Sequence, residues 1–208
     1  MRSVFNPDNF LMRGAEKIFD LASLNLIFLL SCLPLVTIGM AKISLYQTLF
    51  VLKDSRRVSL FTSYVRAFRK NWKLGLQFGG LELVATVLCL LNLLLFRTAE
   101  ALPFQIIKVL SIAVLIFMTI IFLYAYPLAA RYQLGFQAIA QTSLLLASFH
   151  FVWSFVMLGL MGLILLVATW SVLSFLLLGL AFLLIGFAGL AFLQLGPLER
   201  MFEKYQQL

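Results

Sequence analysis

Long apolar segments separated by short polar connections dominate the chain. A helix needs about 20 mainly apolar residues to cross a bilayer. Five segments come near that length, and they cover residues 21–40, 74–96, 104–126, 149–168 and 173–195. None shows the regular alternation of apolar and polar positions that is typical of a membrane β-barrel. The pattern predicts a single all-α domain over residues 1–208, a polytopic transmembrane helix bundle with about five spans.

Three prolines bear on where these helices end. A proline inside a helix removes a backbone hydrogen bond and kinks or breaks the helix. Pro127 and Pro197 are expected to close the third and fifth spans. Pro34 interrupts the first apolar segment and leaves two interpretations open. In the first, which we favour, residues 21–40 form one kinked span that continues into a cytoplasmic helix. In the second, two short helices form a re-entrant hairpin around Pro34.

A strongly basic segment, Lys53–Lys73, lies between the first two spans. It holds seven of the sixteen Lys and Arg residues of the chain and one acid, Asp54. Read as a helix over residues 58–73, it places its aromatic residues on one side and its basic residues on the other. This pattern is typical of an amphipathic helix that lies on a membrane surface with its aromatic face down.

The composition agrees with a membrane protein. Hydrophobic residues make up 63% of the chain and charged residues 12%, whereas a soluble domain has about 45–50% apolar and about 25% charged residues. A net charge of +8 would suggest nucleic acid as the partner of a soluble protein. Lys and Arg also gather in the cytoplasmic loops of membrane proteins. We therefore expect a lipid bilayer with anionic headgroups as a partner, and no nucleic acid.

The distribution of basic residues predicts the orientation. The 41–73 connection carries eight bases, whereas the 97–103 loop has one and the 169–172 turn has none. The positive-inside rule therefore places three parts of the chain in the cytoplasm: residues 41–73, residues 127–148 and the C-terminus. Five full spans would leave the N-terminus outside, whereas the hairpin would return it to the cytoplasm.

Four stretches carry a resemblance to a known family. They are FNPDNFLMRGAEKIFDLASLNLIFLL near the start, CLPLVTIG at 32–39, SYVRAFRKNWKLG at 63–75 and YAYPLAARYQLGF at 124–136. Because these stretches occur in this order, the chain resembles the YesL-like family of small bacterial integral membrane proteins, a domain family of unknown function. The likeness extends over nearly the whole chain, although the last two spans are generic.

The resemblance implies a location in the bacterial plasma membrane. Members of that family tend to be encoded beside carbohydrate ABC importers and glycan-degrading enzymes of Gram-positive bacteria. From this association we expect an accessory protein of carbohydrate uptake that contacts or regulates an ABC sugar importer. The resemblance brings no biochemical activity with it. The alternative is a small homo-oligomeric transporter or channel, in which Glu82 and Asn92 would face a pathway.

Glu82 is the one acid well inside a span, roughly 13 Å beyond Lys73 along a helix. An ionisable group inside a membrane is costly and is by default a candidate for function. Lys108, the only base in the facing spans, would lie near the outer surface. We therefore expect a protonated Glu82 that is hydrogen-bonded to a hydroxyl at similar depth, such as Ser31 or Thr119. A structural hydrogen bond and a proton or substrate role both remain open.

Seven bases are candidates for docking anionic lipid or a cytoplasmic partner. Topology and lipid binding are the simpler interpretation and a protein docking surface is the sharper one, and the pattern does not separate them. For Arg131, two interpretations compete: it anchors a helix end at the headgroups, or it binds an anion. These residues are Arg56, Arg57, Arg66, Arg69, Lys70, Lys73 and Arg131.

Motifs for enzyme chemistry are missing from the sequence. It contains no nucleophile elbow, no paired carboxylates and no Walker-type glycine loop. His150 has no Cys, Asp or second His at ligand spacing, and Cys32 and Cys89 form no disulfide framework. We expect no catalytic residue, no metal and no cofactor.

Small residues in the last two spans allow close packing of helices. We expect them to pack within the bundle, with a face for a partner subunit as the alternative. These residues are Gly159, Gly162, Gly179, Gly186 and Gly189.

Overall fold

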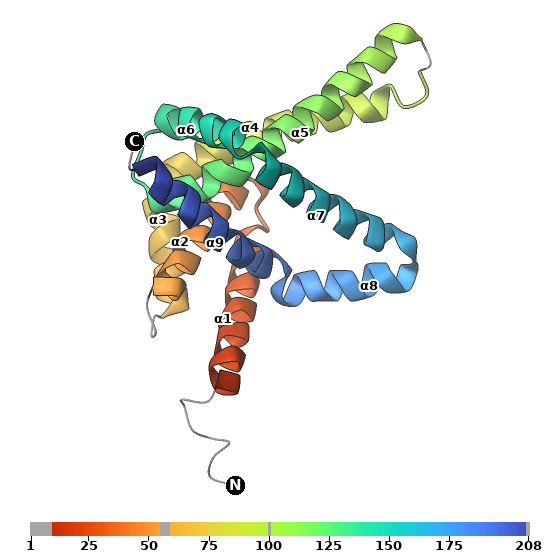
Figure 1. Ribbon diagram of the computed structural model, residues 1–208. Coiled ribbons are helices and arrows are strands. Elements are labelled where there is room, and N and C mark those ends of the chain that lie inside the picture. Colours follow the sequence, from red (N-terminus) through yellow and green to blue (C-terminus); the bar gives the residue numbers. More distant parts are fainter. Residues whose placement is uncertain (1–9, 55–58, 100, 207–208) are drawn as a thin grey trace.

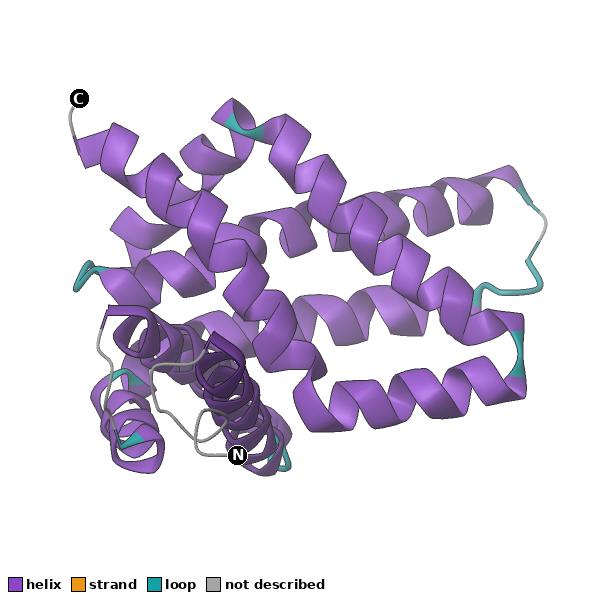
Figure 2. Ribbon diagram, turned by 60° about the horizontal axis from the view of Figure 1, so that its bottom comes forward, coloured by secondary structure: helices purple, strands orange, loops and turns teal. Residues whose placement is uncertain are grey.

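The computed structural model describes residues 10–54, 59–99 and 101–206, and these residues are almost entirely helical. No strand occurs among them, which confirms the predicted all-α class (Figures 1 and 2). The elements, which include a 3-10 turn η1 and a π-helical turn η2, are α1 (Phe10–Ser31), η1 (Leu35–Thr37), α2 (Ile38–Asp54), α3 (Leu60–Lys70), α4 (Trp72–Leu95), α5 (Leu102–Arg131), α6 (Phe136–Phe149), α7 (Phe151–Trp170), α8 (Val172–Ala181), η2 (Phe182–Gly186) and α9 (Phe187–Gln206).

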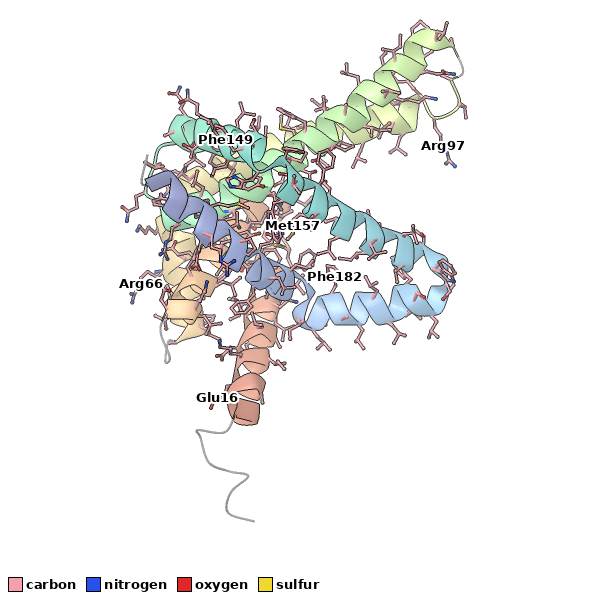
Figure 3. The ribbon with its side chains drawn as sticks, in the orientation of Figure 1. Glu16, Arg66, Arg97, Phe149, Met157 and Phe182 are labelled. Carbon is pink, nitrogen blue, oxygen red and sulfur yellow. The ribbon has the colours of Figure 1, made fainter. Side chains whose placement is uncertain are left out.

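Two long helical hairpins project from one side of the molecule. Helices α4 and α5 form the first and α7 and α8 the second; their tips point the same way in Figure 2 and spread apart on the right-hand side of Figure 1. Arg97 marks the first tip in Figure 3, and Ser171 caps α8 at the second. Large apolar side chains are exposed along both hairpins, among them Leu94, Val109, Leu165 and Leu176.

Five stretches of the described chain are long and apolar enough to cross a membrane. Their exposed apolar surface is suited to lipid, and their backbone groups are paired within the helices, as a hydrocarbon environment requires. The protein is therefore a multi-pass membrane protein that contacts the lipid bilayer. The five stretches are Leu35–Asp54, Trp72–Leu95, Leu102–Arg131, Phe151–Trp170 and Val172–Phe202.

Helix α2 lies at the centre of the fold. It contacts α1, α3, α4, α5 and α9, and half of its most apolar stretch is buried inside the protein, against about a tenth for the other four candidate spans. Ile43 and Leu49 are completely buried, together with the hydroxyl residue Ser44. The other elements are therefore arranged around α2.

Residues 21–40 do not form one helix, and Pro34 breaks the helix rather than only kinking it. Helix α1 ends at Ser31, a non-helical connection and η1 follow, and α2 begins at Ile38. Pro34 is the physical cause, because proline has no N–H to donate and the residue before it is disfavoured in the helical conformation. The Thr37 hydroxyl donates to the carbonyl oxygens of Ser31 and Pro34, at 2.6 and 2.7 Å, and satisfies backbone groups at the break.

The other two prolines do not end their helices, contrary to expectation. Helix α5 passes Pro127 and ends at Arg131, and α9 passes Pro197 and continues to Gln206. Membrane helices tolerate such prolines because neighbouring groups re-satisfy the freed carbonyls. The fifth apolar segment is also divided, since the π-helical turn η2 separates α8 from α9.

Glycines allow α2 and α4 to pack closely against each other. A Cβ added to Gly79 would lie 2.8 Å from the backbone nitrogen of Gly39 and 2.9 Å from its Cα, and Gly75 is equally tight against Met40. By contrast, nothing lies within 4 Å of a Cβ built on Gly159, Gly162 or Gly179. The expectation that these three pack closely within the bundle is therefore wrong. Of the other two, a Cβ on Gly186 would meet the Phe182 ring, and one on Gly189 would make ordinary contact with Ile185.

Candidate intramembrane polar site

The intramembrane acid Glu82 forms an ion pair with Lys42. The Lys42 Nζ donates to both carboxylate oxygens, at 2.6 Å to Oε1 and 2.8 Å to Oε2. The Tyr126 hydroxyl also donates to Oε2, and the Lys42 ammonium lies 4.8 Å from the centre of the Tyr126 ring. Three helices, α2, α4 and α5, therefore meet at one carboxylate.

The glycine contact between α2 and α4 positions this pair. Lys42 follows Gly39 by three residues, and Glu82 follows Gly79 by three residues. Residues three apart lie on the same face of a helix. Because the two glycines touch, the Lys42 and Glu82 side chains are directed into the same interface. Tyr126 comes from α5, which packs against both helices.

The expectation that Glu82 lacks a basic partner at its depth is wrong. The two hydroxyls expected to bond to it, those of Ser31 and Thr119, instead donate to carbonyls one turn back in their own helices, each at 2.8 Å. Sequence reasoning missed Lys42 because it placed the first span at 21–40 and counted Lys42 in the cytoplasmic connection. The signal that could have found it is the pair of glycines one turn apart on α4, just before Glu82.

The pair is half-buried rather than sealed. The exposed fraction is 30% for the Lys42 side chain and 26% for that of Glu82. Removing one partner of a desolvated pair leaves the other charge uncompensated, which is costly in an apolar environment. The arrangement can therefore hold α2, α4 and α5 in register.

Asn92, the second candidate of the intramembrane site, is not part of this cluster. It lies ten residues beyond Glu82 on α4, about 15 Å along the helix axis, and it is half-buried. The structure therefore does not bring the two residues together at one site.

Other polar side chains of the apolar helices also join one helix to another. The Tyr46 hydroxyl of α2 donates to Gln194 Oε1 of α9 at 2.5 Å, and the Gln194 amide donates to the sulfur of Met157 on α7 at 3.5 Å. The Tyr124 and Ser154 hydroxyls, on α5 and α7, lie 3.0 Å apart. Polar groups in the described bundle thus recur as joints between helices.

Completely buried Asn25 holds the π-helical turn. Its amide nitrogen donates to the carbonyl oxygens of Phe182 and Leu183, each at 2.9 Å, and its Oδ1 accepts from the Ala188 amide at 3.0 Å. A π-helical turn disrupts the regular i to i+4 bonding of a helix. One side chain of α1 therefore satisfies three backbone groups around η2. Asn25 is one of several isolated polar residues in the apolar segments, and the local sequence does not distinguish it from the others.

The basic amphipathic helix is shorter than the predicted 58–73. Helix α3 covers Leu60–Lys70, and Lys73 belongs to the first turn of α4. Tyr64 and Ala67 of α3 are buried, whereas Arg66, Arg69 and Lys70 are exposed. Within the described residues no acidic side chain pairs with these three bases. Arg56 and Arg57 lie outside the described residues.

Arg131 contacts the chain itself. Its guanidinium lies 5.1 Å from the centre of the Phe50 ring, and Nη1 is 3.4 Å from the Asp54 carboxylate at the end of α2. Next to it, Lys53 pairs with Glu199 of α9. Both contacts tie the C-terminal end of α2 to the ends of α5 and α9.

The described residues contain no group of three or more His, Cys, Asp and Glu side chains that could hold a metal ion. His150 lies at the joint between α6 and α7, and in the described part of the chain its buried Nδ1 has no hydrogen-bond partner. Cys32 and Cys89 are free thiols.

These features define an all-α, multi-pass membrane protein with a polar joint between its central helices. Residues 21–93 match the model of the family described as "Protein of unknown function, DUF624". The matched part contains Asn25, Lys42, Glu82, Asn92 and the whole of α3. No curated protein and no solved structure matches the chain.

Proposed function

We propose that this protein is an accessory subunit of carbohydrate uptake, which acts by contacting or regulating an ABC sugar importer in a bacterial plasma membrane. The proposal rests on the resemblance to the YesL-like family and on the gene neighbourhood that the resemblance implies. The matched family is described as of unknown function, so the match adds no activity. The proposed role involves no catalytic residue, metal or cofactor.

One structural observation favours an accessory role over conduction. A conducting pathway needs polar groups or charges directed into a continuous pore. In the described bundle, Glu82, Gln194 and Asn25 are each bonded to a neighbouring helix, and they lie at separate joints. Because these polar groups hold helices together and do not line a pore, they favour an accessory protein that presents its surfaces to other proteins.

A small homo-oligomeric transporter is the second candidate. Gly159 and Gly162 favour it, because they leave one face of α7 open, and small residues let a second membrane helix approach closely. The partly exposed Glu82–Lys42 pair would then face a pathway formed between copies.

Co-purification separates the two candidates. The chain is expressed together with an ABC sugar importer of the same organism, extracted in mild detergent and purified through a tag on this chain. Retention of importer subunits supports the accessory role. A homo-oligomer without importer subunits that conducts solute in liposomes would overturn it.

Exchange of Arg66, Arg69 and Lys70 for Glu tests α3 as the contact surface, since importer subunits should then be lost while the chain still inserts normally.

We also infer that both ends of the chain lie in the cytoplasm and that α2 does not cross the membrane. The bases around α3 favour a cytoplasmic start of α4. Gly39, near the start of α2, contacts the first two turns of α4. Asp54, at the other end of α2, contacts the last residue of α5, Arg131. Both ends of α2 therefore meet cytoplasmic ends of other helices, which supports the re-entrant interpretation of residues 10–54.

The direction of α1 supports the same arrangement. In Figure 2 the helix is viewed nearly end-on, whereas the two hairpins lie lengthwise. In Figure 1, α1 likewise runs across the direction of the hairpins. Four crossings, α4, α5, α7 and the α8–α9 pair, would then place both termini on the side that holds the bases.

A further inference from the structure

A shallow groove of about 300 Å³ lies between the last two turns of α1 and helix α3. Ile27 and Leu30 line it from α1, and Phe61, Val65, Phe68 and Arg69 line it from α3. Leu30 and Phe61 are 67% and 64% exposed, so both contribute apolar surface at the open edge of the groove. The volume is at the small end of ligand pockets, which measure roughly 300–1,000 Å³.

The lining is mainly apolar, with the hydroxyl residue Ser31 on α1 and a single positive charge, that of Arg69, on α3. Arg69 is exposed, and no acidic side chain of the described residues pairs with it. The hydroxyl of Tyr64, which also borders the groove, stays neutral because burial raises its pKa well above the usual value. An occupant that complements this lining has an apolar tail and an anionic head.

We propose that this groove is a binding site for an anionic phospholipid of the cytoplasmic leaflet. One acyl chain lies between α1 and α3, and the phosphate contacts the Arg69 guanidinium. The exposed bases Arg66 and Lys70 lie on the same helix but outside the groove, so they add only a weaker, longer-range attraction that salt screens. This site goes beyond the general attraction of α3 to a charged membrane surface, because it requires a particular groove and a particular arginine.

The arrangement of α3 offers a matched control. Arg66 and Arg69 have the same charge, are both exposed and lie three residues apart on one helix, but only Arg69 lines the groove. Arg66 points away from the molecule (Figure 3). A purely electrostatic attraction would depend equally on both residues, whereas the groove depends on Arg69.

Native mass spectrometry of the full chain in detergent, titrated with phosphatidylglycerol or phosphatidylcholine, tests the proposal. We expect Arg69→Gln to weaken the first phosphatidylglycerol binding event by about fivefold or more, as the loss of one base near a headgroup predicts. Arg66→Gln should change it less than twofold. Equal effects of the two substitutions, or equal binding of the two lipids by the unaltered chain, would overturn the proposal.

Filling the groove tests the acyl-chain part independently. Leu30→Trp places a bulky indole ring at the exposed edge of the groove. Leu26→Trp is its control, because Leu26 is exposed on the same helix but does not line the groove. We expect only Leu30→Trp to reduce phosphatidylglycerol binding. Soluble glycerol phosphate should not compete with the lipid. Competition by glycerol phosphate would reveal a free-anion site, and unchanged lipid binding by Leu30→Trp with loss of importer subunits would reveal a protein site. Either result contradicts the lipid proposal.

Discussion

At the residue scale, the Lys42–Glu82 pair has the sharpest energetic consequence. Substituting Lys42→Met leaves the Glu82 carboxylate without its cation in a half-buried position, and should lower the free energy of unfolding by about 1–3 kcal/mol, somewhat less than for a fully buried pair. The double variant Lys42→Met, Glu82→Leu should recover part of that loss, because no charge is then left unpaired. Thermal unfolding in one detergent measures both.

Asn92 serves as the control on the same helix. It lies away from the pair, so Asn92→Leu should leave the unfolding temperature nearly unchanged. If Lys42→Met behaved like Asn92→Leu, the pair would contribute nothing to the stability of the fold. Glu82→Gln retains hydrogen-bonding capacity towards Tyr126 and Lys42, so it separates loss of charge from loss of the contact.

Glycines adjacent in sequence provide a second test at this scale. Gly79 lies against the backbone of Gly39, whereas a Cβ on Gly80 would meet nothing within 4 Å. Gly79→Ala must push α2 and α4 apart and should cost about 1–3 kcal/mol, as overpacking does. Gly80→Ala should be neutral or should stabilise the helix by up to about 1 kcal/mol, because alanine favours helix over glycine. Comparison of the two unfolding temperatures checks the crossing directly, and equal temperatures would argue against a close contact at Gly79.

At the scale of elements, Asn25 links α1 to the kinked helix α8–α9. Asn25→Leu leaves two carbonyls and one amide around η2 without this partner. Unsatisfied buried polar groups cost about 1–3 kcal/mol each, so a loss of at least about 2 kcal/mol is expected. Asn25→Asp keeps the bond from the Ala188 amide, but its carboxylate would be buried against two carbonyl oxygens, so it should lose at least as much stability as Asn25→Leu at neutral pH. Thermal unfolding ranks the three proteins.

A compensating deletion makes the same prediction more specific. Removing one residue of Phe182–Gly186, such as Leu184, would let the π-helical turn close into regular α-helix. The helix would then need fewer bonds from Asn25, so Asn25→Leu should cost less in the shortened chain than in the full one. Equal costs in the two backgrounds would show that Asn25 does not act through the π-helical turn.

Local pattern predicts some of these elements and not others, for physical reasons. The sequence predicts the apolar stretches of α4, α5 and α7 and the amphipathic face of α3. Contact with lipid or with the membrane interface constrains each of these residues separately, so the local pattern is sufficient. Pro34 indicated a break, but its outcome depended on whether Thr37 and the surrounding packing could satisfy the freed carbonyls. Pro127 lies inside α5, although the same residue type breaks the helix at Pro34, and the local pattern does not distinguish the two cases.

The candidate site was only half predictable. Glu82 stood out because a charged residue within an apolar stretch is rare, and three basic residues of α3 were correctly placed on its exposed face. Its partner Lys42 could not be assigned, because depth in the membrane was counted along the chain and the chain turns back at Pro34. The bonds of Asn25 join residues more than 150 positions apart, so no local pattern contains them.

At the scale of the whole molecule, the location of the N-terminus tests the proposed arrangement of α1 and α2. If α2 crossed the membrane from outside to a cytoplasmic Asp54, Ser3 would lie outside. If α1 and α2 form a re-entrant hairpin, Ser3 lies in the cytoplasm, where Arg2, Arg13 and Lys17 are favoured by the positive-inside rule. A cysteine at Ser3, in a chain with its two native cysteines replaced, reports which side is correct.

A membrane-impermeant maleimide applied to intact cells provides the measurement. We expect Ser3→Cys to react only after the membrane is permeabilised, and Ser171→Cys, at the tip of the second hairpin, to react in intact cells. Reaction of both in intact cells would show that α2 crosses the membrane. Because the contacts of Asp54 with Arg131 and of Gly39 with Gly79 would persist in either case, that result would require α4 and α5 to be tilted steeply enough for both ends of α2 to reach opposite surfaces.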